Sequence, residues 1–401
     1  MHLSQRLTDS QKYKESRLMT YIFYISNHGF GHIMREIPVM ARLLECGMQV
    51  ICICGAKQLN AARSYMADRH IIDDNEECGG SGKGRFVCIE GDTDYGTPVI
   101  PGTLKIDARA LERGVRAYVE TFESRIEEAV GLIKRYDAAA VICDIVPWAL
   151  TAAKRAGVPS FFMASFTWIE VFEEYLDEKL LAPYRKCFED ADRVLLYAMA
   201  NEPTRKRFPD GIQVGLAARP FDCERVDNIR RKLSCGGQKL VFMSVGGSNS
   251  GIDTKIDVNG LQYRFVATGG IHFAEGSDNV YELPEGVPDT NNYIAACDYC
   301  ITKPGWSTIT EVLLAGTPAA LIGRPDIAED RMNIAMMCNL GAAVSIDITE
   351  LDDMSKVMNK ISAMDYHRAD FVNDYEHIAG IIMGPVSYTH LRAHETPEHL
   401  V

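Results

Sequence analysis

Residues 302–333 constrain the fold more than any other part of the chain, because they have the pattern of one strand, turn and helix of a parallel sheet. The apolar run CDYCIT stops at a turn formed by Pro304 and Gly305, and the helical pattern STITEVLLAG follows. Ser307 and Thr308 favour the N-cap position of this helix. The segment therefore predicts a helix N-terminus at the carboxyl end of a strand, where open α/β sheets bind ligands.

Such a helix N-terminus suits a diphosphate group, because its free N–H groups carry partial positive charge. Gly305 lets the backbone approach that ligand closely, and Glu311 in the first turns can accept hydrogen bonds from a pair of ribose hydroxyls. The alternative is an ordinary strand, turn and capped helix, because a Pro-Gly pair followed by Ser is a short motif.

A second unit of this kind lies in residues 21–35, YIFYISNHGFGHIMR, where an apolar strand enters a glycine-containing turn and a helix follows. This pattern is typical of the start of a Rossmann-like half. The spacing of His28, Gly29 and Gly31 differs from the dinucleotide fingerprint, which needs three glycines. No nicotinamide or other cofactor is therefore predicted, and the histidines of the turn need another explanation.

Residues 302–333 resemble the carboxyl-terminal domain of GT-B glycosyltransferases, specifically the family that includes the lipid-linked peptidoglycan N-acetylglucosaminyltransferase. The resemblance implies an α/β fold of two Rossmann-like domains whose parallel sheets face each other across a cleft. In that family a Gly-x-x-Thr-x-x-Glu helix, matched here by Gly305, Thr308 and Glu311, holds the donor's diphosphate and ribose.

Two more segments belong to the predicted donor site. Glu329 and Asp330 match a place where the family has acidic or amide residues that accept from donor sugar hydroxyls. Their alternative role is that of exposed acids stabilised by a helix dipole. Gly246, Gly247 and Ser248 follow the apolar strand LVFMSV and leave backbone N–H groups free for a phosphate or a sugar, although a plain loop has the same pattern.

In GT-B enzymes that deprotonate a hydroxyl acceptor, a His at the first turn faces the cleft, and by that match His32 is the candidate general base. Imidazole suits this role because its pKa of about 6.5 is close to neutral pH. It also needs an orienting acceptor, and Asp144 follows the buried strand pattern AAVIC. The alternatives are a structural or capping His32 and an N-cap Asp144.

The first half of the chain, from HGFGH through DIVPW to FTWIEVFEEY, also resembles the glycosyltransferase-like amino-terminal part of plant arabinose kinases. GDTDYGTPVIPGTLKID and VGLAARPF continue that likeness. In those proteins a separate kinase domain phosphorylates the sugar, and the sequence here shows no such domain. The likeness therefore supports the fold more than it supports an activity.

The length fits two α/β domains with a join at a polar, Gly-ended stretch. The first 18 residues are polar and predict disorder, and VSYTHLRAHETPEHLV resembles the translated read-through of a sequencing adapter. If so, the native chain is interrupted near Gly384, and the closing helix that GT-B folds often send back to the first domain could be missing. The expected division is an extension at 1–18, an acceptor-side domain at 19–218, a linker at 219–237, a nucleotide-sugar domain at 238–384 and a non-native tail at 386–401.

Composition excludes several classes of function. A net charge of −13 with scattered acids argues against a nucleic acid partner. Twelve cysteines without a signal peptide predict reduced thiols and a cytoplasmic location. Cys297 and Cys300 lack a second ligand pair, so no metal site is predicted. No apolar run reaches the roughly 20 residues that span a bilayer, while peripheral membrane contact through a lipid-linked acceptor stays open.

These observations predict a GT-B glycosyltransferase that moves a sugar from a nucleotide-diphosphate donor, a UDP-sugar, to a hydroxyl acceptor. No metal is needed, because the helix dipole and loop amides replace the divalent ion of other glycosyltransferase folds, and no Asp-x-Asp lies beside the donor helix. Two alternatives remain. A nucleotide-sugar 2-epimerase has the same two-domain layout but needs no acceptor, and a sugar-nucleotide-binding module binds without turnover.

Overall fold

The computed structural model describes residues 18–72, 84–100, 105–244, 255–284, 286–324 and 326–394. For residues 385–394 and Cys235 it describes the backbone alone. Gly246, Gly247 and Ser248 of the predicted glycine-rich loop lie outside these ranges, as does nearly all of the predicted amino-terminal extension.

The amino-terminal half contains a parallel sheet with the strand order β3-β2-β1-β4-β5-β6-β7. Its central strands are apolar except at their ends and are almost entirely buried, as in parallel sheets covered on both faces by helices. The order reverses between β1 and β4, and this switch point is where ligands bind in such sheets. The strands are β1 (Thr20–Ile25), β2 (Gln49–Cys54), β3 (Arg85–Glu90), β4 (Ala138–Asp144), β5 (Ser160–Ala164), β6 (Arg193–Tyr197) and β7 (Ile212–Val214).

The carboxyl-terminal half repeats this layout with the strand order β10-β9-β8-β11-β12-β13, and its paired strands are again parallel. The switch point here lies between β8 and β11. The strands are β8 (Lys239–Ser244), β9 (Tyr263–Ala267), β10 (Val280–Glu282), β11 (Tyr299–Thr302), β12 (Ala319–Ile322) and β13 (Ala343–Ile346). Two Rossmann-like units of this kind are the architecture predicted from the sequence.

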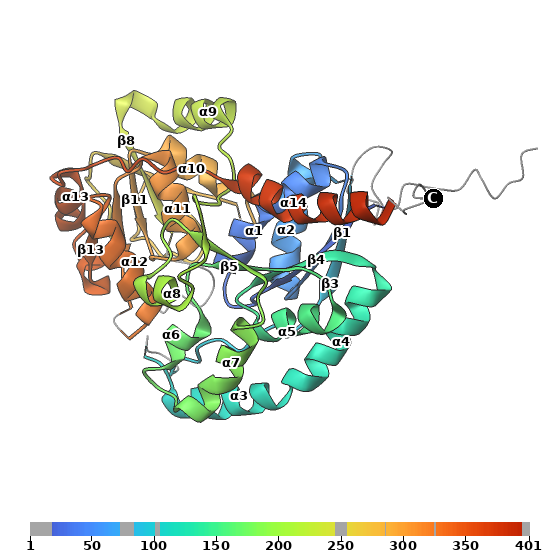
Figure 1. The fold of residues 1–401 in the computed structure, drawn as a ribbon. Helices are drawn as coiled ribbons and strands as arrows, with labels where there is room; N and C mark the ends of the chain where they lie inside the picture. Colours follow the sequence, from blue (N-terminus) through green and yellow to red (C-terminus); the bar gives the residue numbers. More distant parts are fainter. Residues whose placement is uncertain are drawn as a thin grey trace, which may run out of the picture.

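Helices flank both sheets, and the two halves lie side by side (Figure 1). Several outer helices begin at an acidic N-cap, such as Asp107 before α3 and Asp222 before α9, whose carboxylates accept from backbone N–H groups of the first turn. In the first half the helices are α1 (Gly31–Glu45), α2 (Ala56–Asp68), α3 (Ala108–Glu120), α4 (Phe122–Arg135), α5 (Pro147–Ala156), α6 (Trp168–Phe172), α7 (Glu178–Phe188) and α8 (Glu202–Arg207).

The predicted linker at 219–237 contains a helix of its own, α9, which packs against α10 of the second half. From here to the carboxyl end the helices are α9 (Cys223–Leu233), α10 (Thr290–Ala296), α11 (Trp306–Ala315), α12 (Ala328–Asn339), α13 (Met354–Ser362) and α14 (Tyr375–His394), with short 3₁₀ turns at Cys235–Gly237 and Ile348–Asp352.

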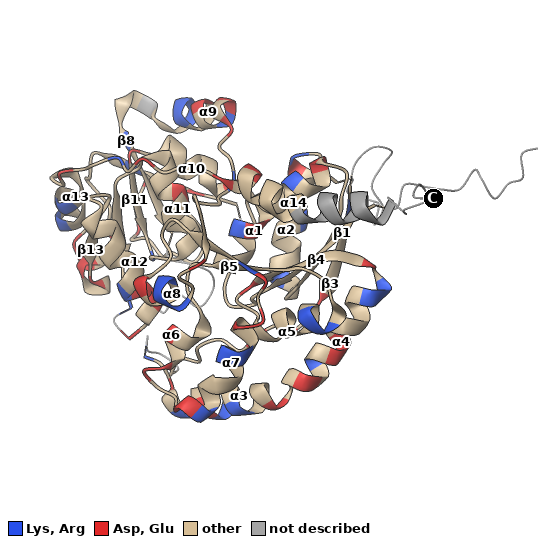
Figure 2. Ribbon diagram, in the orientation of Figure 1, with Lys and Arg blue, Asp and Glu red and all other residues tan. Residues whose placement is uncertain are grey.

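The outer surface carries both signs of charge. On α3, α4 and α9, Lys and Arg alternate with Asp and Glu along the ribbon (Figure 2). Among the residues described, no helix is both long enough and apolar enough to cross a membrane.

The closing helix is present, so the expectation that it could be missing is wrong. Helix α14 leaves the second half and packs against α1 of the first (Figure 1). Ile378, Ala379 and Ile382 on its inner face are fully buried in a core cluster that contains residues of both halves. The segment before it is also anchored, because the backbone N–H of Leu216 donates to the carbonyl of Val372 at 3.0 Å. The backbone of α14 continues to His394, into the segment interpreted as adapter-derived.

The buried face of α14 makes a prediction about stability. Replacing Ile378 with Ala should lower the free energy of unfolding by about 2–5 kcal/mol, because the vacated volume lies in a closed core. Denaturant unfolding measures this change. The exposed neighbour Glu376 is the matched control, and its replacement by Ala should shift stability by no more than about 0.5 kcal/mol. Equal, small effects at both positions would show that α14 does not belong to the core.

Candidate functional site

The amino-terminal ends of two helices, one from each half, meet at the centre of the molecule. A Cβ atom built on Gly31, at the start of α1, would lie 4.0 Å from the backbone nitrogen of Ser307 in the first turn of α11. Neither helix has a side-chain cap or an acidic residue in its first turn. Both sets of first-turn N–H groups are thus free of side-chain competitors for an anionic ligand.

The predicted N-cap of α11 is wrong by two or three residues. Gly305 is the N-cap, and the helix begins at Trp306, so Ser307 and Thr308 lie in its first turn and cap nothing. The reason is packing: the Trp306 ring is buried against Tyr197 of the other half, with ring centroids 5.3 Å apart. Gly305 is exposed, and no atom beyond its chain neighbours would lie within 4 Å of a Cβ built on it, so space remains above it.

The turn before α11 is fixed from behind by α12. The side-chain amide of Asn333 donates to the carbonyl of Pro304 at 2.8 Å, and Pro304 is buried. This contact ties the donor-side turn to the helix that carries Glu329 and Asp330. The turn at Pro304 and Gly305 and the pair of Glu329 and Asp330 are therefore close in space, while the predicted loop at 246–248 lies outside the described residues.

The predicted contact between His32 and Asp144 is confirmed. The Nδ1 atom of His32 lies 2.8 Å from Oδ1 of Asp144, and both side chains are buried. Asp144 is the last residue of β4 and His32 follows β1, and these strands are neighbours at the switch point. Asp144 does not cap α5, whose N-cap is Val146, and His32 does not cap α1, whose N-cap is Phe30. The capping alternatives are therefore excluded.

Arg35, one helical turn after His32, completes this network and was missed in the sequence. Its Nε donates to Oδ2 of Asp144 at 2.6 Å, and its NH1 group donates to Ser165 Oγ at 2.6 Å. Burial acts to raise the pKa of Asp144, but the charges of Arg35 and His32 outweigh burial and lower it to about 2. The carboxylate is therefore ionised at neutral pH and can hold the imidazole in one orientation.

Two backbone positions beside this network have left-handed φ angles. Ile145 directly follows Asp144 with φ 53°, which is unusual for a β-branched residue, and its side chain is fully buried. Strain of this kind persists where the surroundings fix it, and it concentrates at functional sites. Gly29 has φ 74° in the turn before α1. Glycine adopts this left-handed conformation without steric strain, which explains the glycine at this position of the turn.

The same turn is held by Asp94, a residue that sequence reasoning did not single out. Its carboxylate accepts from the backbone N–H of Asn27 at 2.8 Å and from the Trp168 indole at 3.1 Å. His28 packs edge-on against Trp168, and burial together with the charges of His32 and Arg324 lowers its pKa to about 4. A neutral His28 is thus a packing residue of the turn.

The structure gives Glu311 a partner that the sequence did not predict. Arg219 Nε donates to Glu311 Oε1 at 2.8 Å, and both side chains are buried. Arg219 also donates to the Pro288 carbonyl at 2.6 Å and to Thr290 Oγ1 at 3.0 Å. Burial raises the pKa of Glu311, and Arg219 opposes that shift. The ribose role of Glu311 stays a prediction, now beside an observed ion pair.

Asp330 and Glu329 have different environments. Asp330 is buried and accepts from the backbone N–H, Nε and NH2 of Arg324, at 2.8–3.0 Å. The Glu329 carboxylate forms no ion pair or hydrogen bond to other described residues. Burial raises its pKa, and the charge of His32 opposes the rise. Of the two predicted sugar ligands, Glu329 is therefore the one that is available.

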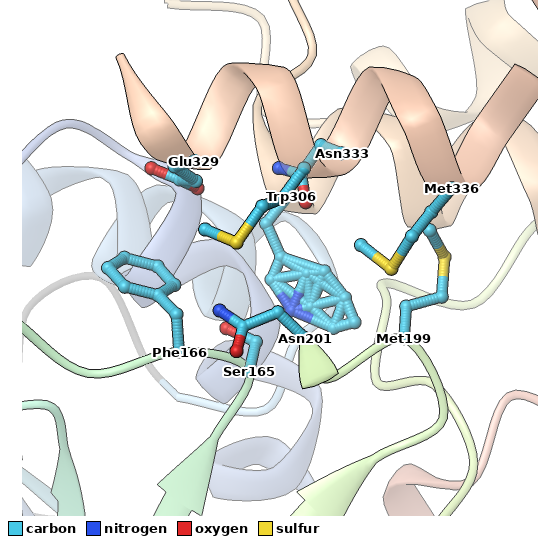
Figure 3. Close-up of a pocket in the computed structure, with 9 residues that line it drawn as sticks. Ser165, Phe166, Met199, Asn201, Trp306, Glu329, Asn333 and Met336 are labelled. Atoms are coloured by element: carbon cyan, nitrogen blue, oxygen red, sulfur yellow. The ribbon is translucent and has the colours of Figure 1, made fainter. Parts of the chain in front are cut away.

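Glu329 borders a small pocket between the two halves, about 210 Å³ including its open mouth. Figure 3 shows its lining: one wall comes from the ends of β5 and β6, and the other comes from α11 and α12. The lining residues are Ser165, Phe166, Met199, Asn201, Trp306, Glu329, Met332, Asn333 and Met336. Phe166 also contacts His32, with ring centroids 5.7 Å apart, so the pocket adjoins the His32 network.

The site residues that the sequence analysis missed differ in how far the sequence pattern could have identified them. Arg35 lies three residues after His32, which places both on one face of α1, so helical spacing could have found it. Arg219 and Asn201 gave no signal, because their contacts depend on how the two halves pack.

Within the described ranges, no group of three or more His, Cys, Asp or Glu residues is arranged to hold a metal ion.

The buried ion pair of Asp144 allows a prediction about the stability of the fold and the pH dependence of that stability. Replacing Asp144 with Asn removes the nearest counter-ion of the buried Arg35 and should cost about 3–5 kcal/mol at pH 7. The folded pKa near 2 lies below the usual value of about 3.9. The wild-type carboxylate thus stabilises the fold above about pH 4, and this contribution is lost as the pH falls towards 2.

Denaturant unfolding of both proteins between pH 7 and pH 2 measures this difference. The gap between wild type and D144N should narrow as the pH falls. The exposed Asp278, changed to Asn, is the control and should show no gap at any pH. A D144N protein as stable as wild type at pH 7 would refute the ion pair.

Comparison with known proteins supports the fold described above. No family model matches the sequence. An L-arabinokinase of Arabidopsis thaliana is 25% identical over 354 residues, which are 82% of this chain and 31% of that protein. The chain thus spans about a third of the length of the curated relative that it matches.

Solved structures of similar shape include the glycosyltransferase SnogD from Streptomyces nogalater, with TM-score 0.53 and 16% identity over 92% of this chain and 99% of that one. CalG4, the calicheamicin glycosyltransferase, has TM-score 0.58 and 12% identity, covering 93% and 99% of the two chains. MurG of Acinetobacter baumannii has TM-score 0.53 and 14% identity, covering 91% and 99%. Two parallel Rossmann-like sheets and these likenesses show that the chain has the GT-B fold that its sequence predicts.

Proposed function

We propose that this protein is a metal-independent glycosyltransferase that moves a sugar from a nucleotide-diphosphate donor, a UDP-sugar, to a hydroxyl acceptor. One observation carries the proposal: His32, at the start of α1 and paired with Asp144 at the end of β4, lies where the starts of α1 and the uncapped α11 meet across the domain interface. A base and an anion site are thus within one small space. Glycosyl transfer needs both, one at each end of the bond that is exchanged.

In this mechanism His32 is the general base. In the tautomer that the mechanism needs, Nδ1 carries the proton and donates to Asp144, and the lone pair of Nε2 takes the proton of an acceptor hydroxyl. The acceptor oxygen bonds to the anomeric carbon while the bond from that carbon to the diphosphate oxygen breaks. The proton ends on His32, and the electron pair leaves with the diphosphate. Attack opposite the leaving group inverts the anomeric centre.

The leaving diphosphate gains negative charge as its bond to the sugar breaks. The first-turn N–H groups of α11 and the helix dipole offset this charge in the role that a divalent ion has elsewhere. Lys303 precedes this turn, and burial together with the charge of Arg324 lowers its pKa to about 8. At neutral pH its ammonium group remains largely charged and adds to the positive potential.

A second candidate function is a sugar-binding module without turnover, and the match to part of an L-arabinokinase favours it. This module would bind a nucleotide sugar or a sugar and would tolerate loss of His32.

We also propose a cytoplasmic location. The cysteines that the structure describes are all free thiols, which supports a reducing compartment.

Titration calorimetry tests the donor site directly. The full chain is titrated with UDP, GDP and their common sugar conjugates. Saturable binding that prefers one nucleotide sugar supports the proposal, and product analysis with and without acceptor alcohols then follows. Conversion of the sugar without an acceptor would identify an epimerase, and binding without any product would identify the module. No binding to any conjugate would refute the donor site.

The base assignment makes a kinetic prediction. Replacing His32 with Ala should lower the transfer rate by about 10²–10⁴-fold, the usual value of a general base, while donor affinity stays within a few-fold of wild type. Rates and calorimetry on the same samples separate these effects. The exposed His377, changed to Ala, is the control and should leave both quantities unchanged. An H32A protein with the wild-type rate would remove His32 from the mechanism.

The observed ion pair lets the ribose role of Glu311 be separated from its structural role. Glu311→Ala should weaken UDP binding about tenfold or more, because hydrogen bonds to ribose are lost, and it should also lower stability. Arg219→Met should lower stability too, because it leaves Glu311 buried and unpaired, but UDP affinity should stay within a few-fold. Calorimetry and unfolding are measured for both variants. Equal losses of UDP affinity would show that Glu311 acts only through Arg219.

A further inference from the structure

Two N–H donors in the pocket between the halves are buried and have no hydrogen-bond partner. They are Nε1 of Trp306, on a side chain that is 4% exposed, and Nδ2 of Asn201, on a side chain that is 5% exposed. Both residues line the pocket of Figure 3, one from each half of the molecule. A buried donor left without a partner costs about 1–3 kcal/mol, so such an arrangement persists where a ligand supplies the missing acceptor.

The orientation of both groups is fixed by other contacts. Asn201 Oδ1 accepts from the backbone N–H of Thr204 at 2.8 Å as the N-cap of α8, which determines where its amide nitrogen lies. The Trp306 ring is held by Tyr197 and by the guanidinium of Arg35, 5.7 Å from the ring centroid. Neither donor can turn away to find another partner without breaking these contacts.

The other two tryptophans show that Trp306 is the exception. The indole N–H of Trp148 donates to Tyr118 Oη at 2.8 Å, and that of Trp168 donates to Asp94 at 3.1 Å. All three tryptophans of the chain are described, and Trp306 alone among them lacks an acceptor.

The position of the pocket identifies the part of the ligand that enters it. Trp306 is the first residue of α11, whose N–H groups hold the diphosphate in the proposed function. On the opposite side, Arg35 of the His32 network donates to Ser165 in the pocket wall. The group bonded to the diphosphate on the side of the base is the sugar.

The lining has the chemistry of a site for a hydroxylated ring. Met199, Met332 and Met336 form an apolar, adaptable wall, as the carbon face of a sugar needs. Asn201 and Trp306 offer donors to a hydroxyl oxygen. The carboxylate of Glu329, which also lines the pocket, offers an acceptor to a hydroxyl proton.

We propose that Asn201 and Trp306 together bind one hydroxyl oxygen of the sugar that is transferred, and that this pair determines which sugar the protein accepts. The inference rests on the proposed function, because it places the sugar beside the diphosphate site. A sugar without that hydroxyl leaves both donors buried and unpaired. The protein should therefore discriminate against the corresponding deoxy sugar by about 10- to 100-fold in affinity.

Indole ¹⁵N–¹H spectra of the full chain labelled at tryptophan test the contact without an activity assay. The probe is whichever of UDP-glucose, UDP-galactose and UDP-N-acetylglucosamine binds tightest by calorimetry, and UDP alone is the reference. The Trp306 resonance, assigned from Trp306→Phe, should shift with the UDP-sugar and not with UDP. The resonances of Trp148 and Trp168, whose indoles are already paired, should stay in place.

Deoxy analogues of the same UDP-sugar, each lacking one ring hydroxyl, test the specificity. Wild type should lose about 10- to 100-fold in affinity for one analogue. Trp306→Phe keeps the packed ring, and Asn201→Asp keeps the cap of α8, so each removes one donor alone. Each variant keeps one donor and should reduce that discrimination to about 3- to 10-fold, while the exposed Asn259→Asp control keeps the wild-type value.

The outcomes separate the two proposals. If no UDP-sugar binds, the proposed function fails, and this inference fails with it. If a UDP-sugar binds but Trp306 responds as it does to UDP alone, and both variants keep the wild-type discrimination, the pocket holds only water. That result overturns the inference and leaves the donor site intact. A destabilised N201D is recognised from its unfolding midpoint, in which case W306F alone decides.

Discussion

The carboxylate of Asp144 lies between two side chains of α1, and the arrangement of the centre of the molecule follows from that contact. His32 and Arg35 both reach it from one face of the helix, so α1 can have only one rotation and one depth over the end of β4. A buried carboxylate that lost either partner would be costly, which makes the contact specific as well as strong. The position of the proposed base is therefore set by an ion pair and not by a loop.

The same arginine connects the two halves of the fold. The guanidinium of Arg35 lies over the rings of Tyr197, from the first half, and Trp306, from the second. It also donates to Ser165 at the end of β5. The charge that holds Asp144 thus also packs against the first residue of α11. A single side chain thus contacts both the His32 network and the helix of the proposed diphosphate site.

The sequence predicted those parts of the site that depend on local pattern and strand order. His32 and Asp144 could be paired because each stands at the carboxyl end of a strand, and the ends of neighbouring parallel strands meet at one edge. The N-cap of α11 was misplaced because the preference of Ser and Thr is worth about 1 kcal/mol, less than burial of the Trp306 ring. The contacts of Arg219 with Glu311 and of Arg324 with Asp330 were not predicted, because these side chains meet only in the folded chain.

Opposition of the two helix starts, at Gly31 and Ser307, has an electrostatic consequence. Each start carries up to about half a positive elementary charge, so the fold brings two like partial charges together. An anion between them removes that repulsion and attracts both halves at once. A diphosphate bound there would act as a bridge between the domains, and the cost of separating the halves would rise with the concentration of free nucleotide. In the proposed function, release of the diphosphate product would restore the repulsion between the two helix starts and so weaken the attraction between the halves.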